Sequence, residues 1–163
     1  MIEHPTPPIV PLPVPDALAA VVAAERGLLA LGMPGCAACM LLPASLAEIA
    51  GARPELVVAI GEFASIDDWR WREELLWPRG IRVSRSSVPA LALLAGGEVV
   101  ATRPGGGPAM VIDRWLEPLL GAAAYPLGDE PTPAELAALD AVTGVIARHR
   151  AVKGRRESSL GAT

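Results

Sequence analysis

The sequence predicts a mixed α/β domain in which a central β-sheet is flanked by helices. Segments with helical spacing of apolar residues take turns with short, β-branched apolar runs, and glycine or proline separates them. The resulting order is helix, strand, helix, strand, helix, hairpin and helix. The chain has 163 residues, 52% of them hydrophobic. Because a domain of about 150 residues buries roughly 70% of its unfolded surface, one full core is expected.

The first 15 residues predict an arm that precedes the domain. Six of them are prolines, which disfavour both a helix and a central strand, so we expect an extended, polyproline-like segment. Asp16 is then the predicted N-cap of a helix over 17–25, where Ala, Val and Leu predominate. Gly27 ends that helix.

The next two segments put two cysteines between a strand and a helix. Residues 28–31 are a short apolar run, which predicts a strand buried on both faces. From 37 to 50 the apolar residues recur at helical spacing, and Pro43 falls inside the pattern. We therefore expect a helix that is kinked near Pro43 and that has Cys36 and Cys39 at its start.

The middle of the chain contains the clearest strand signals. The β-branched run at 55–60 is bounded by proline and glycine, and a Gly-Gly turn joins two later apolar runs. We expect, in order, a strand over 55–60, a short helix over 69–77, an edge piece over 81–83, and a hairpin with strands over 88–94 and 98–102.

The C-terminal part is predicted to be helical with a linker. An amphipathic pattern predicts a helix over 108–120, and Thr132 is the expected cap of a last helix. The expected organisation is an N-terminal arm over 1–15, a domain over 16–121, a linker over 122–133, a C-terminal helix over 134–150 and a basic, disordered tail over 151–163.

Charge and composition exclude several classes of partner. The net charge is −4, whereas nucleic acids and anionic membranes require a basic surface, so neither is an expected partner. The proline-rich start has neither the basic nor the continuous apolar region of a secretory signal. No apolar run reaches the ~18 residues that span a bilayer. These observations predict a cytoplasmic protein.

Residues 16–121 resemble the thioredoxin superfamily in three features. The first is the Cys36-Ala-Ala-Cys39 motif between a buried strand and a helix. The second is Val88-Pro89, which is similar to the superfamily's cis-proline loop. The third is the sequence Gly97-Glu-Val-Val-Ala-Thr102, which is similar to the superfamily's usual sequence for the strand that follows. The resemblance implies a thioredoxin-like three-layer fold and a thiol-disulfide oxidoreductase that acts on a protein client bearing a disulfide or thiol.

The two cysteines have different expected roles. Only a thiolate attacks a disulfide, and the unpaired N–H groups at a helix start stabilise the anion of Cys36, the expected nucleophile. Cys39 lies one turn further in, close enough to resolve the mixed disulfide. Two cysteines at this spacing in a reducing compartment are more typical of catalysis, redox sensing or metal binding than of a structural disulfide.

The resemblance also implies residues that contact the substrate. If Pro89 is cis, the backbone of Val88 presents a short edge that holds an extended substrate segment. Gly35, Ala37 and Ala38, which flank the cysteines, are the other expected substrate contacts. We expect no cofactor and no bound metal, and the sequence leaves dimerisation open.

Two departures from the superfamily pattern modify this expectation. Gly35 stands where thioredoxins carry tryptophan, and no acidic residue occurs from Leu28 to Cys39. Proton transfer to and from Cys39 then needs water or another base. We therefore expect a partner-specific exchanger in place of a general reductant.

Two other functions remain open at this point. The fold could serve as a binding platform, as in a thioredoxin-like chaperone or adaptor for metalloenzyme maturation, with thiols that are not catalytic. Alternatively, the two cysteines could bind metal or sense redox state across a dimer, because one such motif supplies only half of a four-thiolate zinc site.

Overall fold

The structure is a computed structural model that describes residues 7–160. Its elements follow the predicted order, with additional short segments. They are β1 (Leu12–Pro13), α1 (Val14–Val22), β2 (Arg26–Gly32), η1 (Ala38–Leu41), α2 (Leu42–Ala52), β3 (Val57–Glu62), η2 (Ile66–Arg70), η3 (Arg72–Leu76), η4 (Trp77–Arg79), β4 (Ala90–Ala95), β5 (Glu98–Pro104), α3 (Ala109–Leu120) and α4 (Pro133–Leu160).

The five strands form one mixed sheet in the order β1-β3-β2-β4-β5. Strand β3 pairs in parallel with β1 and β2, whereas β4 is antiparallel to both β2 and β5. The predicted hairpin is therefore β4–β5, and the predicted mixed sheet is confirmed. Strand β2 lies in the centre, and its carboxyl end delivers the chain to the cysteines.

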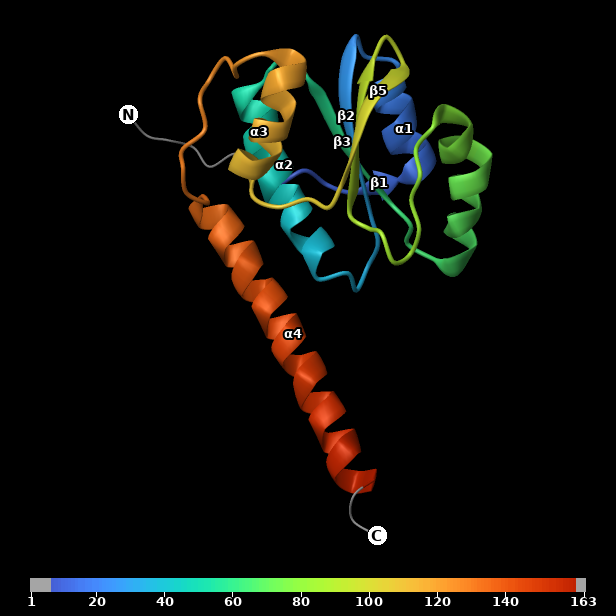
Figure 1. Cartoon of the computed structure of the whole chain (residues 1–163), viewed down its shortest axis with the longest axis vertical. Helices are drawn as coiled ribbons and strands as arrows, with labels where there is room; N and C mark the ends of the chain where they lie inside the picture. Colours follow the sequence, from blue (N-terminus) through green and yellow to red (C-terminus); the bar gives the residue numbers. More distant parts are fainter. Residues whose placement is uncertain (1–6, 161–163) are drawn as a thin grey trace.

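Helices cover both faces of the sheet, which gives three layers (Figure 1). Side chains of β2 alternate between two cores: Leu29 and Leu31 pack with α1 and the η2–η4 segment, while Leu28 packs with α2 and α3. These leucines have no exposed surface. Burial of one leucine side chain stabilises the folded state by about 1.5–3 kcal/mol relative to leaving it exposed. The central strand therefore stabilises the packing of helices on both faces of the sheet. This agrees with the prediction of a strand buried on both faces.

The predicted N-terminal arm is partly incorporated into the domain. Strand β1 pairs with β3, the backbone N–H of Ile9 donates to the carbonyl of Pro43 at 3.0 Å, and α1 begins at Val14 rather than 17. Proline in the first turn of a helix loses no hydrogen bond, and proline is tolerated in an edge strand. The proline content therefore did not exclude these elements. Residues 1–6 lie outside the described part of the chain.

Three other predicted elements differ locally. The expected kinked helix is two elements, a 3-10 turn (η1) that runs directly into α2, with Pro43 in the first turn of α2. The expected helix over 69–77 is a series of three short helical segments. The expected edge piece over 81–83 forms no strand; Ile81 and Val83 are instead buried in the core beside α1.

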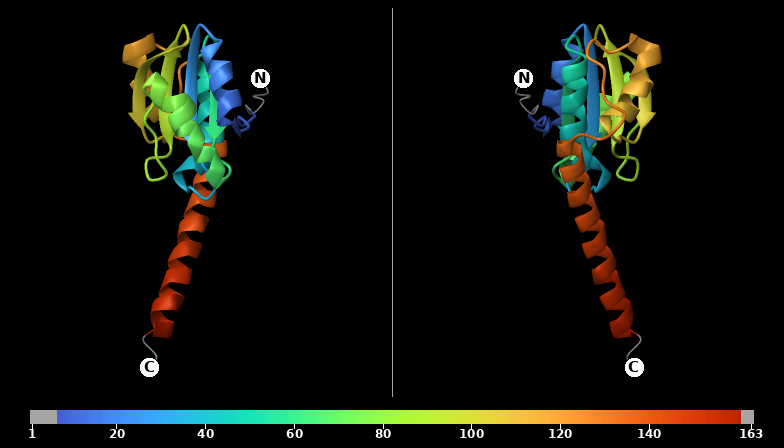
Figure 2. Two further views of the ribbon diagram at one scale, coloured as in Figure 1. Left: turned by 90° about the vertical axis from the view of Figure 1, so that its right-hand side faces the viewer. Right: turned by 90° about the vertical axis from the view of Figure 1, so that its left-hand side faces the viewer.

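The last helix, α4, is longer than predicted. It ends at Leu160, past the predicted end at 150, so helix replaces the predicted tail over 151–160. Residues 161–163 lie outside the described part. At 1.5 Å per residue, 28 residues span roughly 40 Å. Both Figures 1 and 2 show that most of α4 projects away from the three-layer body.

The start of α4 is attached to the body by a buried carboxylate. Glu135 is 2% exposed and accepts hydrogen bonds from the Ser45 hydroxyl at 3.0 Å, from the Ala109 N–H at 2.8 Å and from the Thr132 N–H at 3.2 Å. In return, the Thr132 hydroxyl accepts from the Glu135 N–H at 3.2 Å. One side chain thus contributes to the capping box of α4 and bonds α2 and the start of α3. Within residues 7–160, no helix is both long and apolar enough to cross a bilayer.

Candidate dithiol site

Cys36 and Cys39 lie where the chain leaves the central strand and enters η1. A disulfide joins them, and their Cα atoms are 5.2 Å apart. The backbone N–H of Cys39 donates to Sγ of Cys36 at 3.2 Å. Both side chains are half-buried, so the pair is accessible from one side and supported by the fold on the other.

The loop before β4 lies against Cys36. The peptide bond between Val88 and Pro89 is cis, and the carbonyl oxygen of Val88 is 3.9 Å from Sγ of Cys36. The carbonyl of Pro89 accepts a hydrogen bond from the Gly105 N–H at 2.8 Å, which fastens this loop to the end of β5. Residues that are 52 positions apart in the sequence therefore form one site.

Cys39 packs against the end of β2. A Cβ atom at Gly32 would lie 3.2 Å from both Cβ and Sγ of Cys39, a distance tighter than most contacts in proteins. Glycine at this position therefore allows the helix to approach the strand closely. The consequence is that Cys39 is the inner of the two cysteines.

Glu62 is an acidic residue of the site that the sequence analysis missed. It ends β3, pairs with Gly32 of β2 in the sheet, and lines the same pocket as Cys39. The strand that precedes the cysteines contains no acidic residue, whereas Glu62 comes from the neighbouring parallel strand. Aligning the two predicted strands at their carboxyl ends would have put Glu62 opposite Met33, one residue from its observed partner Gly32.

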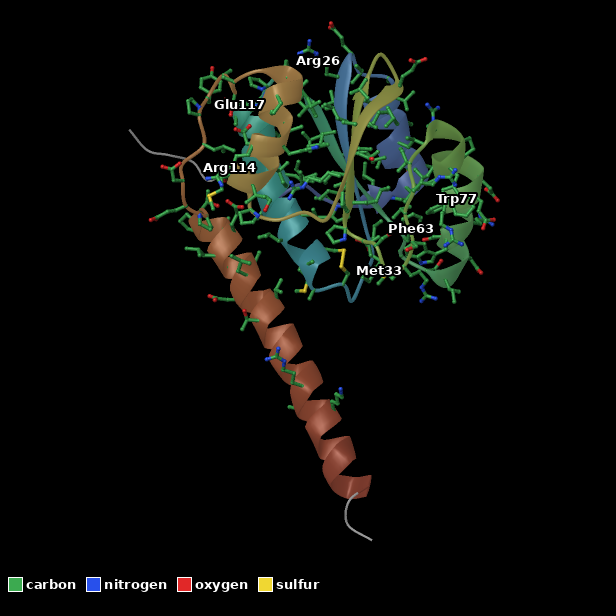
Figure 3. All side chains as sticks on the ribbon, in the orientation of Figure 1. Arg26, Met33, Phe63, Trp77, Arg114 and Glu117 are labelled. Carbon is green, nitrogen blue, oxygen red and sulfur yellow. A yellow bond between two sulfur atoms is a disulfide. The ribbon has the colours of Figure 1, made fainter. Side chains whose placement is uncertain are left out.

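The pocket beside the cysteines is open and has a volume of about 170 Å³. Cys36, Cys39 and Glu62 share it with proline side chains from the N-terminal segment and α2, and with Met33 and Met40. Figure 3 shows Met33 at the end of the body where the two sulfur atoms are joined. Apart from the carboxylate, the lining is apolar or contains sulfur.

Solved structures of low sequence identity have the same architecture. The chain is similar to a mutant thioredoxin from Halobacterium salinarum, with 19% identity and a TM-score of 0.51 over 72% of this chain and 95% of that one. It is also similar to thioredoxin f2 from Chlamydomonas reinhardtii, with 13% identity and a TM-score of 0.52 over 69% of this chain and 97% of that one. For oxidized thioredoxin O2 from Arabidopsis thaliana, the identity is 18% and the TM-score is 0.52 over 72% of this chain and 98% of that one.

The chain has the thioredoxin fold. The sequence-based expectation of this fold is thereby confirmed. No protein-family model matches the sequence, and no curated protein matches it. At identities of 13–19%, the likeness concerns the fold, so the chemistry has to be argued from this chain's own residues.

On the thioredoxin fold, the other predicted contact residues lie around Cys36. Gly35 is exposed and has a φ of 76°, a left-handed conformation that glycine adopts without strain. Ala37 is half-buried and Ala38 is exposed at the start of η1. Gly35, Ala37, Ala38 and Val88 thus border the outer cysteine. Their contact with a substrate stays a prediction.

Proposed function

We propose that the protein is a thiol-disulfide oxidoreductase that acts on protein disulfides through Cys36 and Cys39. The observation that carries the proposal is the Cys36–Cys39 disulfide beside the Val88 carbonyl, at the entrance to an open pocket. The similar solved structures are named thioredoxins, and one of them is in the oxidized state.

The two cysteines support a two-step exchange. In the reduced protein, the thiolate of Cys36 attacks one sulfur of the client disulfide, so a mixed disulfide forms and the client's first thiolate leaves. The thiolate of Cys39 then attacks Sγ of Cys36, which releases the client's second thiolate and forms the Cys36–Cys39 disulfide. Two electrons pass from the dithiol to the client. The reverse sequence oxidises a client dithiol.

Geometry supports Cys36 as the nucleophile. The N–H of Cys39 points at Sγ of Cys36 from 3.2 Å, and a hydrogen bond to the charged form favours the thiolate. The Val88 carbonyl lies beside the same sulfur, where the backbone of an extended client segment could pair. Cys39 is packed on Gly32, which suits the resolving role.

The position of Glu62 supports a role for its carboxylate in proton transfer. Cys39 must lose its proton before it attacks the mixed disulfide, and a carboxylate in the same pocket can accept that proton directly or through one water. The strand before the cysteines has no acidic residue, and we therefore assign Glu62 the role of general base for Cys39. With Glu62 as the base, the absence of tryptophan before Cys36 is the remaining feature that supports a specific protein partner.

Single-cysteine variants test the proposal. We expect the wild-type protein to reduce insulin disulfides with dithiothreitol as the electron donor, and Cys36→Ser to lose this activity. Cys39→Ser should accumulate a mixed disulfide with the client, because nothing resolves it. Ser86→Ala, an exposed substitution in the loop before Val88, is the matched control. Retained exchange in Cys36→Ser, or no exchange in the wild type, would contradict the proposal.

A further inference from the structure

Sulfur is concentrated at one place in the molecule. The chain has four methionines and two cysteines. Four of these six residues fall between positions 33 and 40, and all four line the pocket at the dithiol site: Met33, Cys36, Cys39 and Met40. Disulfide exchange uses the two cysteines but gives no role to the methionines.

The two methionines stand on either side of the cysteine motif in the sequence. Met33 directly follows β2; it is half-buried and packs against the core on the α1 side. Met40 follows Cys39 within η1 and is 38% exposed. A half-exposed methionine beside a reactive pair is not accounted for by core packing alone, because its side chain covers little of the core.

The chemistry of this lining selects a soft metal ion. Thiolate and thioether sulfur are ligands for Cu(I), whereas a structural zinc site needs four ligands from thiolate, imidazole or carboxylate groups, and thioethers are not among them. Among residues 7–160, no three His, Cys, Asp or Glu side chains gather in a way that would hold a metal. Glu62 is the one acidic group that lines this pocket. The donors present therefore favour a monovalent soft cation over a divalent one.

We propose that the reduced protein binds one Cu(I) ion in this pocket. The thiolates of Cys36 and Cys39 are the principal ligands, and the thioethers of Met33 and Met40 complete the coordination shell. Binding releases the protons of the two thiols and transfers no electron, so it does not rest on the exchange activity. The disulfide form has no thiolate to offer, so the redox state of the pair controls access of the metal.

The test is an anaerobic titration of the full chain with Cu(I) against the chromophoric competitor bicinchoninate. The protein is first reduced with a phosphine, which is then removed, and its methionine methyl groups carry ¹³C. We expect one Cu(I) per reduced chain and none in the disulfide form. The methyl signals of Met33 and Met40 should shift on binding, while that of Met110, which lies in α3, should not.

Leucine variants supply the quantitative arm. Met33→Leu and Met40→Leu conserve volume, and each should weaken Cu(I) binding by at least about tenfold. Loss of a residue that only supports a metal ligand already costs about 10–100-fold in affinity, so loss of a ligand should cost no less than the lower value. Met110→Leu is the matched control and should bind like the wild type. Circular dichroism of each variant verifies that it is folded.

Several results would overturn the inference. These are equal affinities of the two leucine variants and the wild type, methionine signals that do not move, one Cu(I) per two chains, or displacement of Cu(I) by Zn²⁺. Insulin reduction is measured on the same preparations. Exchange that persists without copper binding would overturn this inference alone, whereas copper binding without exchange would overturn only the proposed function.

Discussion

The carboxylate of Glu135 accepts a hydrogen bond from the backbone N–H of Ala109 at 2.8 Å, and so joins the start of α4 to the start of α3. The same oxygen accepts from the Ser45 hydroxyl of α2. An acidic group in this position satisfies an N–H at a helix start that has no partner within its own helix. Glu135 thereby helps to attach the projecting last helix to the body, where α4 also contacts η1 and α2.

Glu135→Ala should therefore destabilise the protein. The substitution leaves the Ser45 hydroxyl and the N–H groups of Ala109 and Thr132 without their acceptor. Each buried polar group left unpaired costs about 1–3 kcal/mol. We expect a loss of at least about 3 kcal/mol in the free energy of urea-induced unfolding. Glu130→Ala, which removes an exposed carboxylate of the linker, should change it by less than about 0.5 kcal/mol.

A second prediction concerns pH. Burial, together with the nearby carboxylate of Glu135, raises the pKa of Glu48 above its ordinary value. The folded protein therefore keeps the Glu48 proton at pH values where the unfolded chain has lost it. The stability that protonated Glu48 contributes is fully present below the ordinary pKa of glutamate. It is lost as the pH rises through the raised pKa of Glu48 in the folded protein.

Glu48→Gln should remove this decline. Compared with the wild type, the variant should be more stable at about pH 7 and nearly equal at about pH 4, where glutamate is largely protonated in both states. The measurement is the free energy of urea-induced unfolding at the two pH values. Glu74→Gln, at an exposed position, controls for the loss of one negative charge. A Glu48→Gln variant that is less stable at pH 7 would contradict the assignment.

A third prediction tests the role of Glu62. If this carboxylate accepts the proton of Cys39, Glu62→Gln should slow resolution of a preformed mixed disulfide by roughly 10²-fold or more at neutral pH. The loss should shrink as the pH rises and Cys39 ionises without assistance. Stopped-flow release of the client thiol across the pH range measures both effects. An equal slowing at every pH would indicate a merely structural role for Glu62.

Much of the fold could be predicted because local signals agree with the tertiary structure. The apolar run from Leu28 to Leu31 indicates a strand buried on both faces, and Gly96-Gly97 marks the turn of the hairpin. The predicted sheet and hairpin follow from such patterns. The position of the cysteine pair where β2 leads into the next helical segment was equally clear from the sequence.

The differences arise where tertiary contacts outweigh local preference. Prolines at 11–15 disfavour regular structure in isolation, yet β3 offers an edge to pair with and the first turn of α1 tolerates them. The capping box from Thr132 to Glu135 was readable as a local motif. Its burial against α2 and α3 was not, because that depends on residues 26 and 90 positions away. Glu62 was missed for the same reason.

The proposed exchange requires Cys36 to be a stabilised thiolate in the reduced protein. The measurement is the rate of iodoacetamide alkylation against pH for Cys39→Ser, which keeps the backbone N–H that faces Sγ of Cys36. We predict an inflection clearly below about 8.5, the ordinary pKa of a cysteine thiol. The remaining Cys39 of Cys36→Ser, tested in parallel, should titrate higher. An inflection for Cys36 at or above about 8.5 would contradict its role as the activated nucleophile.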